Sequence, residues 1–121
     1  MNGVVLVTDA LETRIDERLP EYRSDLFELL SQPSISTTGT GMDDCAALLA
    51  SILEKRGFDE PKRIETSGHP IVYAERIVDE SRPTVTFYGH YDVQPPGSED
   101  RWTSPPFEPT VRDGSVYARG S

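Results

Sequence analysis

The sequence is poor in cysteine and has no long hydrophobic run. Cys45 is its one cysteine, so the chain cannot form an internal disulfide or a cysteine zinc cluster. The apolar run at positions 4–7 has no basic segment before it and acidic residues soon after it, unlike a secretory signal. No segment approaches the roughly 18 apolar residues of a membrane-spanning helix. These features predict a cytoplasmic setting and no membrane partner.

Basic residues are also scarce. Twelve Lys and Arg residues stand against 21 Asp and Glu, giving a formal net charge of -9, and only Lys55 and Lys62 are lysines. Nucleic-acid binding requires a basic face that displaces counterions from phosphates, so we expect no nucleic-acid partner. A solvated acidic surface explains the composition, and a salt-adapted source is a special case of it.

Apolar residues occur in regularly spaced blocks, which indicates a folded chain about the size of one domain. Leucine and isoleucine residues four positions apart predict an amphipathic helix over 8–30, with a break or restart at Pro20. A second helix is predicted over 43–56. Gly57 suits the left-handed position that closes such a helix.

Short β-type segments follow the helices, at 62–66, 71–78 and 84–89, with turn residues between them. The stretch 93–114 is rich in proline and predicts an ordered, irregular loop, followed by a last strand over 115–119. Helices followed by short strands predict an α/β fold in which helices pack on a mixed, mostly parallel sheet. The order of the strands cannot be derived from these patterns.

His90 and Asp92 stand one residue apart where the predicted strand over 84–89 ends. Ligands of α/β proteins collect at the carboxyl ends of strands. Because alternate side chains of an extended segment share a face, the imidazole and the carboxylate should converge, with Tyr91 pointing away. Such a pair could bind a metal ion, with the carboxylate orienting the histidine. A surface pair that stabilises a turn is the alternative.

The surroundings of this pair make a specific, ordered set of motifs, which begins with "LLSQPSIST" and the "LEKRGF" helix end. The later motifs are "GHYDVQP", Trp102, "PPFEP", "RDG" and "RGS". Together they resemble the N-terminal part of the di-zinc aminoacylase, carboxypeptidase and dipeptidase family, most of all its carnosinase-like dipeptidase branch. The resemblance extends over nearly the whole chain from about Leu11.

The resemblance implies a metal-dependent hydrolase that cleaves amide bonds of dipeptides, short peptides or N-acyl amino acids. Residues 1–121 would be the N-terminal portion of a truncated, zinc-peptidase-like catalytic domain. In the family, the residue at His90 binds one of two divalent ions. The resemblance implies zinc for these ions, with manganese or cobalt as alternatives. The residue at Asp92 is the supporting catalytic residue. Ala118 departs from the glycine of many relatives, which affects only how closely the last strand approaches the site.

Other parts of the family's site lie downstream of the matched region. They include the bridging aspartate, the general-base glutamate, the remaining metal ligands and the dimerisation domain. The resemblance therefore implies a fragment that supplies one metal ligand and is inactive alone, and a homodimer in full-length form. The alternative is a non-catalytic fragment or interaction module from an interrupted gene.

Further residues are expected to have structural roles. His69 lies in a turn-like context and is expected to be a solvent-exposed turn residue, and Cys45 a small buried one. Trp102 and Phe107 are expected to pin the proline-rich loop to the core, with a place in a substrate cleft as the alternative. The "RDG" at 112–114 predicts a tight turn between two strands, with glycine supplying a positive φ.

Overall fold

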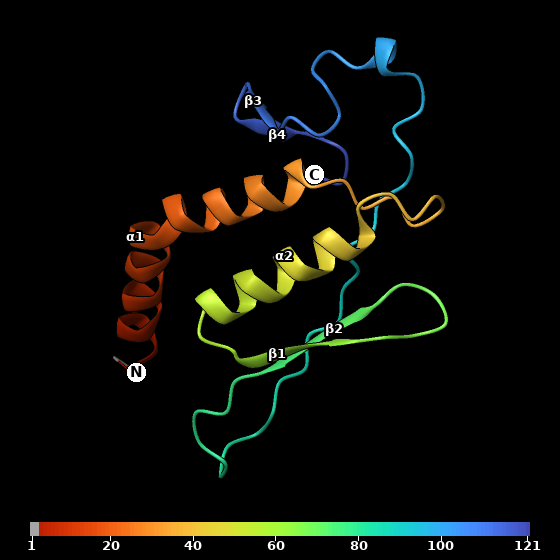
Figure 1. The fold of residues 1–121 in the computed structure, drawn as a ribbon. Helices are drawn as coiled ribbons and strands as arrows, with labels where there is room; N and C mark the ends of the chain where they lie inside the picture. Colours follow the sequence, from red (N-terminus) through yellow and green to blue (C-terminus); the bar gives the residue numbers. More distant parts are fainter. Residues whose placement is uncertain (1–2) are drawn as a thin grey trace.

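A computed structural model of the chain describes the backbone of residues 3–121 and the side chains of residues 8–121. Along these residues run two helices, two β-hairpins and one short 3-10 helix (Figure 1). Their combination confirms the predicted α/β class. In chain order the elements are α1 (Gly3–Ser31), α2 (Met42–Lys55), β1 (Asp59–Ile64), β2 (Ile71–Glu75), η1 (Glu99–Arg101), β3 (Thr110–Arg112) and β4 (Ser115–Tyr117). Within residues 3–121, no helix has the length and apolar character needed to cross a membrane.

Helix α1 contains Pro20 and is nevertheless continuous. A proline inside a helix cannot donate its backbone hydrogen bond, and its ring crowds the preceding turn, so the helix bends. Figure 1 shows α1 bent between its two halves. The predicted break is therefore a bend. The helix begins earlier than the predicted 8–30, and at its end the Ser31 hydroxyl donates to the Phe27 carbonyl at 2.8 Å.

Helix α2 ends as the sequence predicted. Gly57 has a φ of 85°, a left-handed conformation that suits glycine. Its N–H donates to the Glu54 carbonyl at 2.9 Å, and the Phe58 N–H donates to the Leu53 carbonyl at 3.0 Å. These two bonds form a Schellman motif, which satisfies carbonyls that a helix end leaves open. The chain then turns back, so that α2 contacts both strands of the first hairpin.

Strands β1 and β2 form an antiparallel hairpin, with Ile64 opposite Ile71. They lie within or next to the predicted strands at 62–66 and 71–78, although β1 begins earlier and β2 ends earlier. The pairing register shifts near the start of β1, where Glu60 has a positive φ of 37°. Figure 1 shows this hairpin lying along α2.

Strands β3 and β4 form a second antiparallel hairpin. Asp113 and Gly114 connect them, with φ values of 49° and 78°. A two-residue loop with positive φ at both positions matches the right-handed twist of its strands. The predicted turn at 112–114 is thus confirmed. Strand β3 lies inside the segment 93–114 that was predicted to be irregular, and β4 ends two residues before the predicted 119.

The predicted strand over 84–89 does not form, and the described strands do not make the predicted, mostly parallel sheet. Both hairpins are antiparallel, and the one parallel pairing among the described residues is an isolated bridge between Ile35 and Val93. An alternating apolar pattern gives strand propensity, yet a strand also needs a hydrogen-bonded neighbour. No described residue pairs with 84–89, and Phe87 and Tyr88 are 90% and 96% exposed.

The buried apolar core is small and lies where the end of α1, the start of α2 and the end of the described chain meet. Cys45 is only 1% exposed, which confirms its predicted role as a small buried residue. Burial raises the pKa of its thiol, and a weaker interaction with the Ser34 side chain acts in the opposite direction. The buried apolar residues are Leu30, Met42, Cys45, Ala46 and Ala118.

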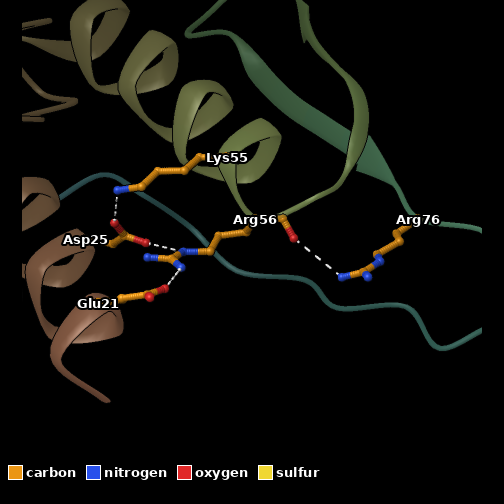
Figure 2. A network of polar contacts seen from close by, with 5 residues as sticks. All are labelled: Glu21, Asp25, Lys55, Arg56 and Arg76. Atoms are coloured by element: carbon orange, nitrogen blue, oxygen red, sulfur yellow. Dashed lines mark hydrogen bonds and ion pairs between the residues drawn. The ribbon is translucent and has the colours of Figure 1, made fainter. Parts of the chain in front are cut away.

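A network of charged side chains joins the two helices (Figure 2). The buried carboxylate of Asp25 accepts from Arg56 Nε at 2.5 Å and from Lys55 Nζ at 2.9 Å. Arg56 Nη1 also donates to Glu21 at 2.7 Å, and Arg76 donates to the Arg56 carbonyl at 3.4 Å. The hydrogen bonds from Arg56 and then Lys55 lower the pKa of Asp25 to about 2. Asp25 therefore remains charged and fixes α1 against the end of α2.

Candidate metal centre

His90 and Asp92 lie side by side just after the unpaired segment 84–89. His90 Nδ1 is 3.0 Å from Asp92 Oδ1 and 3.0 Å from the Asp92 backbone carbonyl oxygen. Both partners are acceptors, so the neutral ring carries its proton on Nδ1 and leaves the Nε2 lone pair available. The His90 side chain is 78% exposed and that of Asp92 is 35% exposed. The structure thus brings together the two groups that the sequence singled out, with one ring nitrogen free to act as a ligand.

The second oxygen of Asp92 has a partner that the sequence did not reveal. Ser36 Oγ donates to Asp92 Oδ2 at 2.6 Å. This hydrogen bond is the largest cause that lowers the pKa of Asp92; partial burial opposes it and the His90 hydrogen bond adds to it. The carboxylate is therefore held in its charged form. Each oxygen accepts one hydrogen bond, from a different part of the chain.

Residues 90–93, here called the site segment, are fixed by residues 32–41, here called the anchor loop. The Val93 N–H donates to the Ser34 carbonyl at 2.8 Å, and Ser34 Oγ donates to the Tyr91 carbonyl at 2.7 Å. On the other side, the Tyr91 hydroxyl donates to the Pro70 carbonyl at 2.6 Å. These bonds hold the backbone on both sides of Asp92.

The anchor loop is itself closed tightly. The Ile35 N–H donates to the Thr40 carbonyl at 2.9 Å, which brings the two ends of the turn together. Gly41 has a φ of 70°, and a Cβ at this position would lie 2.0 Å from the Pro33 carbonyl oxygen. Only glycine fits so close to another backbone segment. The loop therefore depends on Gly41 as well as on its hydrogen bonds.

His69, the second histidine, contacts the anchor loop rather than the site segment. Its Nε2 is 2.8 Å from the Ser36 carbonyl oxygen, which can only accept, so Nε2 carries the proton. Its own carbonyl accepts from Thr66 Oγ1 at 2.8 Å, within the predicted turn. The ring is half-buried, which corrects the expectation of a solvent-exposed residue. Its contact explains the burial, because the ring supports the loop that carries Ser36.

A cavity of about 260 Å³ lies beside the pair. Its walls come from the end of α1, the anchor loop, the site segment and residues 119–120. A larger cavity of about 420 Å³ lies between the end of α2 and the first hairpin, and neither His90 nor Asp92 lines it. The smaller cavity is therefore the one relevant to chemistry at the pair.

The end of the described chain packs against the site segment. Gly120 has a φ of 93°, and a Cβ there would lie 2.7 Å from Val93 Cγ1. Arg119 Nε donates to the Gln94 carbonyl at 2.7 Å, and its N–H donates to the Pro106 carbonyl at 2.6 Å. The "RGS" motif thus lies close to the pair because it contains glycine at this position.

The proline-rich loop is held by its own aromatic residue. Trp102 Nε1 donates to the Pro96 carbonyl at 3.0 Å. Trp102 and Phe107 are both half-buried, and neither lines the cavity beside His90. Trp102 therefore closes the loop on itself, and neither aromatic residue takes the alternative place in this cavity.

The donor set around His90 fits one metal ligand rather than a complete site. In the part of the chain that the structure describes, no three His, Cys, Asp or Glu side chains group in a way that could hold a metal ion. His90 offers Nε2, and Asp92 supports the opposite ring nitrogen. Carboxylate support of this kind is typical of histidines that bind zinc, because it fixes the ring and raises its basicity.

An α/β chain that offers a carboxylate-supported histidine beside a cavity has part of the arrangement found in metal-dependent hydrolases. Comparison with known proteins shows which family the chain is similar to. The model of peptidase family M20/M25/M40 matches residues 86–121, which contain the pair. In sequence and in fold the chain is similar to members of this family, which agrees with the predicted resemblance to its N-terminal part.

Individual relatives agree with this result. The chain is 43% identical over 94 residues to a succinyl-diaminopimelate desuccinylase of Azoarcus sp. (strain BH72). Its fold is similar to an M20 family metallo-carboxypeptidase of Sulfolobus solfataricus, with a TM-score of 0.74 and 43% identity over 78% of the chain. It is also similar to a dipeptidase of Saccharomyces cerevisiae, with a TM-score of 0.77 and 27% identity over 89% of the chain.

The chain spans only about a quarter of the length of these relatives. It covers 23% of the desuccinylase, 22% of the carboxypeptidase and 26% of the dipeptidase. The similarity therefore concerns only the part of each relative that aligns with this chain.

Proposed function

We propose that residues 1–121 form the N-terminal portion of the catalytic domain of a metal-dependent amide hydrolase. Its substrates would be dipeptides, short peptides or N-acyl amino acids. The similar proteins support this class, because a desuccinylase, a carboxypeptidase and a dipeptidase each remove an acyl or amino-acid group. The observation that carries the proposal is the His90–Asp92 hydrogen bond, which lies within the residues that match the peptidase family.

In this proposal His90 binds one divalent ion through Nε2. Asp92 accepts the Nδ1 proton of His90, which keeps the ring in one orientation and increases the electron density at Nε2. The pKa of Asp92 is lowered, so its carboxylate stays charged at neutral pH and holds that proton. The cavity of about 260 Å³ beside the pair would admit part of a small substrate.

The cofactor would be two divalent ions, zinc first, with manganese or cobalt as alternatives. When bound, such ions lower the pKa of a water molecule and polarise a carbonyl oxygen. His90 is the one direct ligand that this chain would supply, and the fragment alone would be inactive. The proposal also includes a homodimer in full-length form, a cytoplasmic location, and no nucleic-acid or membrane partner.

The test uses the full-length protein, purified with zinc and, in parallel, with manganese or cobalt. Its turnover is measured on a panel of dipeptides and N-acyl amino acids. Asp92→Asn should lower kcat/KM by about 10–100-fold, the usual effect of losing the support of a metal-bound histidine, and His90→Ala should lower it further. His69→Ala is the comparison variant and should lower kcat/KM less than either, because His69 supports the anchor loop without contacting His90 or Asp92.

Unchanged turnover in His90→Ala would contradict the proposal. A full-length protein with no hydrolase activity on any member of the panel would favour the alternative of a non-catalytic interaction module. The coding sequence after Ser121 discriminates between the two at low cost, since an in-frame continuation beginning with aspartates favours the enzyme.

A further inference from the structure

The carboxylate of Asp92 needs a second contact to face His90. The terminal torsion of an aspartate side chain is broad, so a bond from one oxygen to a neighbouring ring does not fix the carboxylate by itself. Ser36 Oγ supplies the missing contact at 2.6 Å from Oδ2, while Oδ1 is 3.0 Å from His90 Nδ1. Ser36 and Asp92 are 56 residues apart in the chain.

Ser36 is itself held in place from two directions. Its carbonyl oxygen accepts from His69 Nε2 at 2.8 Å, and its neighbour Ile35 is paired with Thr40 within the anchor loop. Ile35 also pairs with Val93 in the site segment. The position of the Ser36 hydroxyl is therefore set by the backbone around it, independently of the carboxylate that it contacts.

We propose that Ser36 is a positioning residue that orients the Asp92 carboxylate and thereby sets the tautomer of His90. With Oδ2 held by Ser36, Oδ1 faces Nδ1 and keeps the proton there, which leaves Nε2 as the free ligand atom. Without the hydroxyl, the carboxylate can turn, and the neutral ring moves toward the Nε2–H form in which that nitrogen cannot bind a metal ion. The backbone carbonyl of Asp92 also contacts Nδ1, so the change is partial. The inference rests on the proposed function only for the role of His90 as a ligand.

The experiment measures the tautomers by ¹⁵N NMR on the 121-residue chain labelled at histidine, about two pH units above the usual histidine pKa, near pH 8.5. His69 and His90 are its only histidines. Ser36→Ala removes the hydroxyl and keeps the carbonyl that accepts from His69, so His69 is an internal control. Ser36→Thr retains a hydroxyl, and Asp92→Ala shows the full effect of losing the carboxylate.

We expect His90 to carry its proton on Nδ1 in the parent chain and in Ser36→Thr. In Ser36→Ala the Nδ1–H fraction should fall most of the way to its value in Asp92→Ala, while the His69 signals stay unchanged. A parent-like His90 in Ser36→Ala would overturn the inference, as would a parent-like His90 in Asp92→Ala or a parent chain without the Nδ1–H preference. Loss of the His69 signals in Ser36→Ala would also overturn it, because Ser36 would then hold the loop as a whole.

The result separates this inference from the proposed function. A full-length protein without hydrolase activity would leave the tautomer measurement unaffected. Conversely, an active enzyme whose His90 tautomer ignores Ser36 would retain the proposed function and remove the positioning role. In an active enzyme, Ser36→Ala should weaken zinc binding by up to about 10–100-fold, and Ser36→Thr should restore it.

Discussion

Two neighbouring stretches of the chain, the site segment at 90–93 and the unpaired segment at 84–89, are stabilised very differently. The site segment is hydrogen-bonded to the anchor loop on one side and to Pro70 on the other. The segment at 84–89 has a strong apolar pattern and leaves Phe87 and Tyr88 exposed. The geometry of the His90–Asp92 pair therefore depends on polar contacts with distant loops, and not on pairing of the strand-like segment before it.

The largest effect on stability is expected in the anchor loop, whose hydrogen bonds distinguish the site segment from the segment at 84–89. Gly41→Ala should lower the free energy of unfolding by about 3 kcal/mol or more, because it adds left-handed strain and a Cβ 2.0 Å from the Pro33 carbonyl oxygen. Gly39→Ala is the control. Gly39 has a similar φ of 74°, but its nearest contact would be His69 at 3.8 Å, so about 1 kcal/mol is expected. Urea unfolding followed by circular dichroism measures both, and equal losses would contradict the close packing of this loop.

A smaller effect is expected where the chain end meets the site segment. Gly120→Ala should lower the free energy of unfolding by about 2 kcal/mol, since its Cβ would lie 2.7 Å from Val93 and the φ of 93° is strained for alanine. Gly97→Ala is the control, because Gly97 also has a positive φ, of 75°, but a Cβ there would have no atom within 4 Å. The difference between the two variants in urea unfolding isolates the contact with Val93. Equal losses of stability in the two variants would contradict the close packing of Gly120 against Val93.

The contact between Asp25 of α1 and the end of α2 is also made by polar side chains, but it lies away from the site segment. The pKa of Asp25 is about 2 in the folded chain and lower than its ordinary value of 3.8, because it accepts from Arg56 and Lys55. Its contribution to stability is therefore present above about pH 4 and is lost as the pH falls toward 2.

Melting temperatures between pH 5 and pH 2 measure this contribution. Asp25→Asn should lower the melting temperature by roughly 5 °C at pH 5 and should flatten its decline toward pH 2. Asp16→Asn, an exposed change on the same helix, should leave the decline as it is. A decline in Asp25→Asn as steep as in the parent chain would mean that Asp25 is not held by Arg56 and Lys55.

The smallest effect on stability is expected in the unpaired segment. Phe87→Lys should change the free energy of unfolding by less than about 0.5 kcal/mol, because the side chain is 90% exposed. It should nevertheless reduce self-association, since an exposed apolar strand-like segment is a template for pairing with another chain. Sedimentation velocity at several concentrations checks this, with the exposed change Glu80→Lys as a control for charge. A large loss of stability would show that the segment packs within the chain.

The features that the sequence predicted are those that depend on near neighbours. The helix end at Gly57, the turn at 112–114 and the shared face of His90 and Asp92 all follow from spacings of a few residues. The motifs around the pair were enough to predict the similarity to the peptidase family, because five of them occur in one order.

The features that the sequence did not predict depend on distant neighbours. The contact between Ser36 and Asp92 joins positions 56 residues apart, and that between Tyr91 and Pro70 joins positions 21 apart. A serine in a polar loop carries no local sign of such a partner. Similarly, the apolar alternation of 84–89 shows strand propensity but not whether a neighbouring strand is there to pair with.

The most direct test of the account is the zinc content of the full-length protein and of two histidine variants, measured by native mass spectrometry after removal of loosely bound metal. The account predicts two tightly bound zinc ions per chain in the parent and in His69→Ala, and the loss of at least one in His90→Ala. Equal zinc content in His90→Ala and the parent would contradict the claim that the His90 ring, held by Asp92, is a metal ligand.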